Sequence, residues 1–600
     1  MPIAVCADWA DPRSDQRECG DFTVLPLLSP PVRGSHACDQ LSNDVARLNH
    51  VTVVADARLD NLSELRDDLD ATNTSTPAEI LARAYFKWGV EFPEHLAGDF
   101  AVVLWDAAER RVLAVRDPFG VKSLFYRLSS ERIWFASREA RILGTFSGFP
   151  EVDERSVVEY LLGVYRSVDA TFFREIRRVP AGHLLIIRPS EIRATRFWKP
   201  LSSFVNRKKA QPTDQVLEEF RRLFKRAILR RIQSTAGAIV HVSGGVDSSS
   251  IAVACDLLSR EIDAMPRLIG ASAAFPGLRC DEGSYISAIE TKVRFPIERW
   301  DGTSPNAVDI LDPAAERPGA RCAFIDGMLG DLEIAKREDI SVILSGNGGD
   351  ELTINTGTTR DMVAAHEWIR AINRLLFYGD RDGSSRAGRV KSFLGQCLPL
   401  RARAWRARAR AIAGVPSWLV PELRSVARDI LQPEMSNAKG SHAEEHVWNR
   451  LNSQQLIRGV EAHQMQALSF GVEYRFPFLD RDLVRLVLSM AGGYWPFGTR
   501  PHQKALSEDL PSAVANRASK ADLTPALANR LSRAASPIED QFLKGRWASE
   551  RYVVRELAAS EWRAFDRQTA QGIQCRRMWS VVTLEAWLRK VFGYSSPQEA

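Results

Sequence analysis

A glycine-rich turn between an apolar strand and a helix restricts the possible folds of this chain more than any other feature. Residues 243–249 read Ser-Gly-Gly-Val-Asp-Ser-Ser, and they lie between the apolar segment 237–242 and a helical pattern over 248–260. Two further apolar segments, 268–275 and 342–344, predict buried strands. Because strands that alternate with helices form parallel sheets, this part of the chain is expected to be an α/β domain.

The turn has the composition of an anion site. Gly244 and Gly245 permit a positive φ and a close approach of the backbone to a ligand. The helix that follows offers unpaired N–H groups and the positive end of its dipole. Asp247 could hold Mg²⁺ against phosphate oxygens. The lysine of a Walker A loop is absent, which argues against that class of nucleotide site. The residues expected to cradle phosphates are Ser243, Gly244, Gly245, Ser248 and Ser249.

A second acidic loop follows the predicted strand 342–344. Its residues 345–351 read Ser-Gly-Asn-Gly-Gly-Asp-Glu and end in the adjacent carboxylates of Asp350 and Glu351. Open α/β sheets bind ligands at the carboxyl ends of their strands. If this strand neighbours the first, Asp350 and Asp247 meet there, and we predict that they share Mg²⁺.

The chain before residue 195 has a different pattern. From about 50 to 195 it is β-rich with short turns, including a predicted hairpin of strands 100–105 and 111–116. Helical periodicity appears over 78–88 and 154–162. This part is therefore expected to fold separately from the α/β domain.

Domain boundaries follow from these patterns. A polar segment with prolines at both ends, 199–213, predicts a linker. We expect one domain over 1–198 and a second over 214–600, which opens on an amphipathic helix at 214–233 and is mostly helical after residue 360.

Composition excludes several classes of protein. Lys and Arg number 80 against 75 Asp and Glu, and a net charge of +5 is too small to indicate a nucleic-acid partner. No run of about 18 apolar residues exists, so membrane insertion is not expected. The first residues lack a signal-peptide pattern. The 8 cysteines are scattered without metal spacing, which is typical of reduced thiols in a cytoplasmic protein.

One dense basic run, 401–410, alternates arginine with alanine around a single tryptophan. A solvated helix face is the simpler interpretation. A surface for an acidic precursor peptide, a partner protease or RNA is the alternative.

Several motifs together resemble one family. The loop 243–249 resembles the pyrophosphate loop of the ATP pyrophosphatases, which cleave ATP between the α and β phosphates. The loop 345–351 resembles the second signature of the asparagine synthetase family, and 473–480, Glu-Tyr-Arg-Phe-Pro-Phe-Leu-Asp, resembles a third. The segment from His502 to Lys520 resembles the basic stretch that ends in a catalytic lysine.

The N-terminal part resembles the class II glutamine amidotransferase domain. The segments that carry this resemblance are 96–101, 116–120, 135–139 and 173–182. The resemblance implies an Ntn-type αββα sandwich, followed by a parallel-sheet α/β ATP pyrophosphatase domain with a helical C-terminal part.

The family resemblance also implies roles for residues. A substrate carboxylate would attack ATP to give an acyl-adenylate, with pyrophosphate as leaving group. Asp247 and Asp350 would hold Mg²⁺, and Lys520, with Lys504 as a second candidate, would stabilise the transition states. The adenine is expected on backbone at strand ends, near Val242, Ala274, Ser345 and Gly346. The substrate pocket is expected to include Asn347, Glu351, Glu473 and Arg475. Glu473 and Arg475 could instead form a structural brace, and Glu351, Tyr474 or a water could be the base for the amine.

The sequence departs from asparagine synthetases in two places. Class II glutaminases act through a cysteine at position 2, where this chain has Pro2, and Cys6 could serve only after cleavage of five residues. Glutaminase activity is therefore expected to be absent. Asn347 stands where asparagine synthetases have a glutamate and β-lactam synthetases a tyrosine, and asparagine is a poor base.

Loss of the glutaminase is shared by β-lactam synthetases, carbapenam synthetases and lasso-peptide macrolactam cyclases, and the segments 275–286 and 348–351 are similar to those of the lasso-peptide cyclases. Such cyclases adenylate an Asp or Glu side chain of a leader-free core peptide, and the N-terminal amine of the peptide closes an isopeptide bond. The expected partners are the precursor core peptide and, in the same pathway, a leader protease and a leader-binding protein. An amide synthetase with a small substrate is the alternative, and a non-catalytic binding module would be expected to lack Asp247, Asp350 or Lys520.

Overall fold

The chain divides into two compact units in this computed structural model. Unit 1 contains residues 1–156, 167–199 and 457–465, and unit 2 contains 157–166, 200–456 and 466–600. The structure describes residues 4–8, 22–24, 44–129, 132–146, 148, 150–188, 191–200, 214–303, 329–353, 361–363, 366–377, 394, 400–432, 442–491, 500–517, 521–539, 547–564 and 572–592. Lys520 and most of the predicted linker lie outside the described residues.

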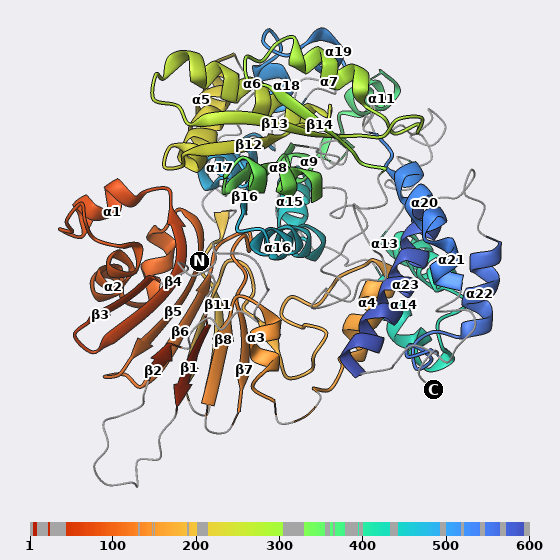
Figure 1. Cartoon of the computed structure of the whole chain (residues 1–600), viewed down its shortest axis with the longest axis horizontal. Helices are drawn as coiled ribbons and strands as arrows, with labels where there is room; N and C mark the ends of the chain where they lie inside the picture. The colour runs from red at the N-terminus through yellow and green to blue at the C-terminus, as the bar shows by residue number, and fades with distance from the viewer. Residues whose placement is uncertain are drawn as a thin grey trace. The chain divides into compact units, whose positions relative to one another are not determined.

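Unit 1 contains two antiparallel sheets (Figure 1). One sheet has the order β2 (Phe22–Val24), β1 (Ala4–Asp8), β8 (Arg132–Ala136), β7 (Phe125–Leu128) and β9 (Arg177–Arg178). The other has the order β11 (Glu191–Arg196), β10 (His183–Arg188), β6 (Arg111–Arg116), β5 (Gly98–Asp106), β4 (Val51–Leu59) and β3 (Asp44–Leu48). Apolar side chains from both sheets form one core, which includes Val103 of β5 and Phe135 of β8. The unit is therefore a sandwich whose two layers face each other.

Helices cover the outer faces of this sandwich. α2 (Pro77–Trp88) packs on β3 and β4, and α3 (Glu139–Leu143) packs on β7 and β8. The start of α2 is set by a capping box, in which Thr76 accepts from the Glu79 N–H and the Glu79 carboxylate accepts from the Thr76 N–H. The short helix α1 (Leu62–Asp68) precedes it. The αββα order expected from the sequence is confirmed.

Unit 2 is built on a five-stranded parallel sheet. Its order is β14 (Ile297–Asp301), β13 (Arg267–Ala274), β12 (Gly237–His241), β15 (Val342–Leu344) and β16 (Glu473–Arg475). Helix α6 (Val246–Glu261) lies on one side of the sheet and α8 (Leu329–Arg337) on the other (Figure 1). The chain proceeds from β12 through β13 to β14 on one side of the sheet, and later from β15 to β16 on the other side. The direction of this order therefore reverses between β12 and β15. Sheets of this kind bind ligands at such a point, beyond the carboxyl ends of the strands.

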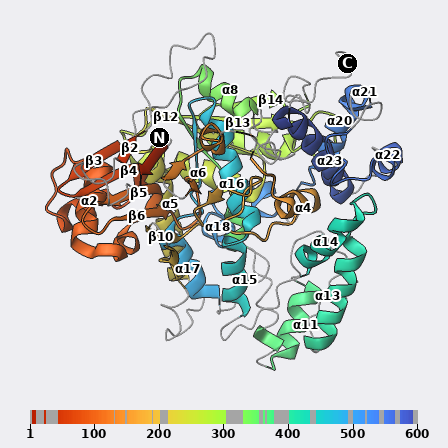
Figure 2. The same cartoon turned by 90° about the horizontal axis from the view of Figure 1, so that it is seen from below.

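The remaining helices of unit 2 are mostly C-terminal, as predicted. α13 (Leu400–Gly414) lies beside α14 (Arg424–Leu431), and α20 (Thr524–Arg533) beside α23 (Gly572–Phe592) (Figure 2). The other helices of this unit include α4 (Glu154–Leu162, shared with unit 1), α5 (Asp214–Ile232), α7 (Gly283–Glu290), α9 (Gly349–Thr353), α11 (Trp368–Phe377), α15 (His442–Leu451), α16 (Gln454–Leu468, shared with unit 1), α17 (Arg481–Ala491), α18 (Pro501–Ala505), α19 (Ser512–Ala515), α21 (Ala535–Ile538) and α22 (Arg555–Arg563).

Two observations concern the basic run 401–410 and the prediction about membrane insertion. Arg406, Arg408 and Arg410 on α13 are exposed, as a solvated helix face would be. In the described part of the chain, no helix combines the length and the apolar character that crossing a bilayer requires.

Candidate active site

The first loop follows β12 directly and leads into the N-terminus of α6. Gly244 has a φ of +71°, and a Cβ placed there would lie 3.0 Å from the Tyr285 Cβ and 3.1 Å from the Glu282 Cβ. The Ser248 hydroxyl accepts from the Ser243 N–H at 3.0 Å and lies 2.9 Å from the Ser243 hydroxyl. These contacts hold the loop in a tight turn whose backbone can approach a ligand closely.

This turn supports a prediction about Gly244. The substitution Gly244→Ala should lower ATP–pyrophosphate exchange by roughly 5- to 150-fold, because it adds both a strained φ and a tight contact with Tyr285 and Glu282, which together cost roughly 1–3 kcal/mol. Gly163→Ala is the matched control, since Gly163 has a φ of +65° and nothing within 4 Å of its added Cβ. Equal exchange rates for the two variants would show that the close packing of the loop is irrelevant.

The second loop meets the first at the predicted edge of the sheet. β12 and β15 pair in parallel, with Ile239 opposite Ile343 and Val240 opposite Leu344. A Cβ on Gly346 would lie 3.0 Å from the Ser248 N, and a Cβ on Gly349 would lie 2.7 Å from the Asp247 Cγ. The glycines of the second loop are therefore what allow it to approach the start of α6.

Three oxygens of Asp247 and Asp350 converge on one point, which the guanidinium of Arg500 occupies. Its Nη1 lies 2.6 and 2.8 Å from the two Asp247 oxygens and 2.8 Å from Asp350 Oδ1. Burial by itself would raise the pKa of Asp247, but the Arg500 guanidinium and the His502 ring hold that pKa well below its usual range. Asp247 is therefore a carboxylate at any pH at which the protein would be assayed.

His502 also contacts Asp247 and is fully buried. Its Nε2 lies 2.8 Å from Asp247 Oδ1. Burial lowers the pKa of His502 despite the adjacent carboxylate, so the ring is neutral at neutral pH. Arg500 is a cation that lies within ion-pair distance of both carboxylates.

The donor set fits Mg²⁺. Carboxylate oxygens are the ligands that Mg²⁺ prefers, and it is commonly bound by one or two protein carboxylates with substrate phosphates completing its shell. Within the described ranges, no group of three or more His, Cys, Asp or Glu side chains is placed to hold a metal ion. The buried Ser249 hydroxyl lacks a hydrogen-bond partner among those same residues, and a phosphate would supply one.

Arg517 connects the C-terminal segment to the first loop. Its Nη1 donates to the Gly244 carbonyl at 2.9 Å, its guanidinium pairs with Glu282, and it stacks on the Tyr285 ring at 4.1 Å. The guanidinium thus braces the turn against the start of α7.

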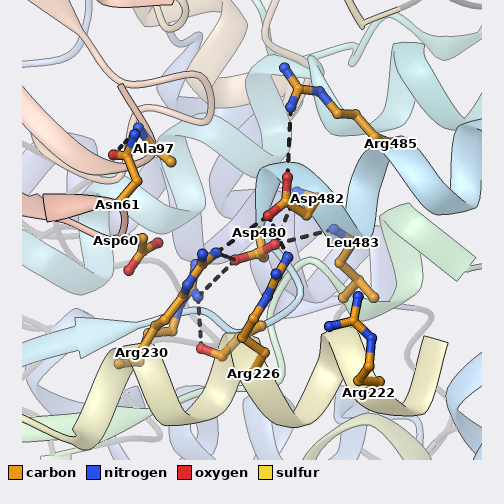
Figure 3. Close-up of polar contacts among 12 residues, drawn as sticks. Asp60, Asn61, Ala97, Arg222, Arg226, Arg230, Asp480, Asp482, Leu483 and Arg485 are labelled. Carbon is orange, nitrogen blue, oxygen red and sulfur yellow. Dashed lines mark hydrogen bonds and ion pairs between the residues drawn. The ribbon is translucent and has the colours of Figure 1, made fainter. Parts of the chain in front are cut away.

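Segment 476–482 is held beside the second loop by arginines of α5. Arg226 Nη2 lies 2.6 Å from Asp482 Oδ2, and Arg230 Nη1 lies 3.4 Å from the same oxygen. Figure 3 shows both arginines pointing toward Asp482. Arg231 contacts Asp480 at 3.5 Å. A Cβ on Gly348 would lie 2.5 Å from Leu479 Cδ2, so this anchored segment supports the second loop.

The other predicted site residues are placed as follows. Val242 and Ser345 are buried at the ends of β12 and β15, and Ala274 ends β13. Asn347 is half-buried in the second loop, and Glu351 lies 4.0 Å from Arg450. Lys504 is exposed on α18. Arg475 pairs with Glu473 at 3.3 Å and donates to the Arg231 carbonyl, which is the arrangement of a structural brace.

Three site residues escaped the sequence reasoning: Arg500, His502 and Arg517. The last two stand in the basic stretch already singled out, but only the lysines there received a role. Arg500 precedes a proline that opens α18, a recognisable helix start. No pattern in the sequence indicated that its side chain would reach Asp247, 253 residues earlier.

Comparison with known families identifies two domains. The asparagine synthase family matches residues 219–589, and a glutamine amidotransferase domain matches residues 44–198. The first match alone covers more than half of the chain.

The individual relatives have low sequence identity to this chain. The amidase chyE of Penicillium rubens is 27% identical over 308 residues, covering 48% of this chain and 44% of the relative. The glutamine-hydrolyzing asparagine synthetase 3 of Bacillus subtilis is 26% identical over 342 residues, covering 53% of this chain and 54% of the relative. The chain thus matches about half the length of these relatives. A solved structure of the allosteric regulatory enzyme of purine biosynthesis is 14% identical and covers 43% of this chain and 62% of its own; its TM-score of 0.20 is too low to support an argument.

Proposed function

The chain belongs to the asparagine synthase family, and from this premise we propose that it is an ATP-dependent ligase that forms an amide bond and releases AMP and pyrophosphate. The observation that carries the proposal is the meeting of two glycine-rich loops at the switch point of the parallel sheet. Three carboxylate oxygens of Asp247 and Asp350 converge there beside the N-terminus of α6. This arrangement suits a metal-bound polyphosphate better than any other ligand class.

The proposed role of each residue follows from its charge or its hydrogen-bonding groups. The first loop would bind the β and γ phosphates through backbone N–H groups and the hydroxyls of Ser243, Ser248 and Ser249. Mg²⁺ held by Asp247 and Asp350 would neutralise charge that develops on the leaving pyrophosphate. Asn347, at the tip of the second loop, would face the acyl group, and Lys520 remains the candidate cation for the acyl-transfer step.

For the substrate, we favour the side-chain carboxylate of a short leader-free core peptide, whose own N-terminal amine would close a macrolactam of the lasso type. Support comes from Asn347, which offers no carboxylate to bind or deprotonate ammonia, and from the lasso-like segment 275–286. Glutamine hydrolysis is not part of the proposal. Cys6 lies in the middle of β1, opposite Thr23 on one side and Trp134 on the other, rather than at a free terminus. A leader protease and a leader-binding protein would be partners in the same pathway.

A second function is favoured by the names of the relatives. Several are asparagine synthetases, and the glutamine amidotransferase match covers residues 44–198, which include most of unit 1. Under this alternative, the same adenylating site acts on a small carboxylic acid, with ammonia or an internal amine as acceptor.

The decisive experiment measures ATP–pyrophosphate exchange and AMP release with one set of substrates at a time. Mg²⁺ is present throughout, and the sets are aspartate alone, aspartate with ammonia, aspartate with glutamine, and a leader-free lasso core peptide. We expect AMP only with the peptide, together with a product lighter by one water. Turnover with aspartate and ammonia would establish the alternative, and no AMP with any of these sets would contradict both.

A further inference from the structure

We propose that Arg500 is a built-in counter-ion of the carboxylate pair, which a divalent cation must displace before it can bind. One nitrogen, Nη1, is within 2.8 Å of both oxygens of Asp247 and of Asp350 Oδ1. A hard cation would take its oxygen ligands from the same point. Two positive charges cannot share these oxygens without strong repulsion, so the guanidinium and the metal exclude each other.

The environment of the two carboxylates explains why a resident cation is present. They approach a common point from two loops, and Arg500 Nη1 lies at that point. Two partly buried carboxylates that meet at one point repel each other, and the guanidinium of Arg500 offsets this repulsion. The side chains of Asp247 and Asp350 are only 15% and 18% exposed, so solvent compensates them incompletely.

The backbone that carries Arg500 is held in place. Its N–H donates to Gln503 Oε1 at 3.3 Å, the Gln503 Nε2 donates to the Ala515 carbonyl at 2.6 Å, and Pro501 fixes the first turn of α18. The guanidinium would therefore leave the carboxylates by rotation of its side chain, without movement of the helix. An arriving polyphosphate offers it a new anionic partner.

This inference deepens the proposed function, and it rests on it for the roles of Asp247 and Asp350 as metal ligands. It predicts that the nucleotide-free protein binds divalent cations poorly at this site. Metal and nucleotide would then bind together. The nucleotide carries the divalent cation that competes with Arg500, and its phosphates offer the guanidinium a new anionic partner.

The test measures Mn²⁺ binding to the full chain without nucleotide, by the electron paramagnetic resonance signal of free Mn²⁺. Arg500→Gln should lower the Kd for Mn²⁺ by roughly tenfold or more, since a repelling charge is removed. Arg500→Lys keeps the charge and should bind as weakly as the wild type. The double variant Arg500→Gln/Asp350→Asn should lose the gain, which would locate the ion at this carboxylate pair.

Equal Mn²⁺ affinity for wild type and Arg500→Gln would overturn the proposal, as would tight binding by the wild type. If Arg500→Gln does not fold, Arg500→Met keeps the aliphatic stem of the side chain and carries the same expectation. The measurement uses no nucleotide and no acceptor. If the protein does not form AMP, the measured effect of Arg500→Gln on Mn²⁺ affinity still holds. If Arg500→Gln does not change the Mn²⁺ affinity, the proposed AMP-forming function is not contradicted.

Discussion

Asp350→Asn should lower ATP–pyrophosphate exchange by roughly 10³-fold, because the amide retains the shape of the carboxylate but not the charge that holds a hard cation. Fixed charges and donors that stabilise a developing anion in a partly buried site contribute several kcal/mol each. Asp247→Asn should have an effect at least as large, since Asp247 contacts both Arg500 and His502. The measurement is radiolabel exchange between pyrophosphate and ATP at saturating Mg²⁺ and substrate.

The control for this experiment is Glu338→Gln, the same loss of one carboxylate charge in unit 2. Glu338 follows α8 and pairs with Arg267 and Arg337 away from both loops. Circular dichroism of each variant would establish that the fold is retained. Exchange by Asp350→Asn within about threefold of the Glu338→Gln rate would show that Asp350 holds no essential ion; smaller differences fall within ordinary surface effects.

Glu461→Gln should lower the apparent Tm by roughly 5–15 °C, the equivalent of about 3–5 kcal/mol in a domain of this size. Glu461 is fully buried in the part of α16 that belongs to unit 1. Its carboxylate accepts from Arg178 Nε at 2.8 Å and Nη2 at 3.2 Å, and from Arg116 Nη2 at 3.3 Å. Both arginines are at most 1% exposed, so removal of the one carboxylate takes the ion-pair partner from two buried cations.

The matched control is Glu219→Gln, which removes the partner of an exposed ion pair. Glu219 and Arg222 lie three residues apart on α5, and pairs of this kind contribute at most about 0.5 kcal/mol. Its Tm should stay within about 2 °C of the wild type, measured in parallel by differential scanning calorimetry. A Glu461→Gln midpoint that is equally unchanged would mean that the buried arginines are compensated by their backbone partners alone. Those partners are the carbonyls of Lys122, Val179, Gly120 and Ala170.

Several elements were predictable because their local pattern and their burial agree. The apolar segment at β15 is fully buried, and the helix over 154–162 begins and ends as its periodicity indicates. β14 was missed because Ile-Glu-Arg-Trp-Asp, with its part-exposed side chains, lacks the apolar character of a buried strand. β16 was missed because three residues are too few to show a period, and only its pairing with β15 makes it a strand.

The sequence by itself determined the composition of the two loops, and with it the ligand class that we propose for them. Glycines between an apolar strand and a helix, with an aspartate in the first turn, predict a phosphate-binding turn through steric and dipolar effects that act within a few residues. The same local reasoning indicated that Asp247 and Asp350 would meet if their strands were neighbours. Tertiary structure alone decided that they are neighbours, and that the counter-charge comes from Arg500. The distance between side chains 253 residues apart depends on how whole elements pack, which no local pattern records. The partners of Glu461 follow the same rule, since a buried charge is stable only where the fold brings its counter-ions.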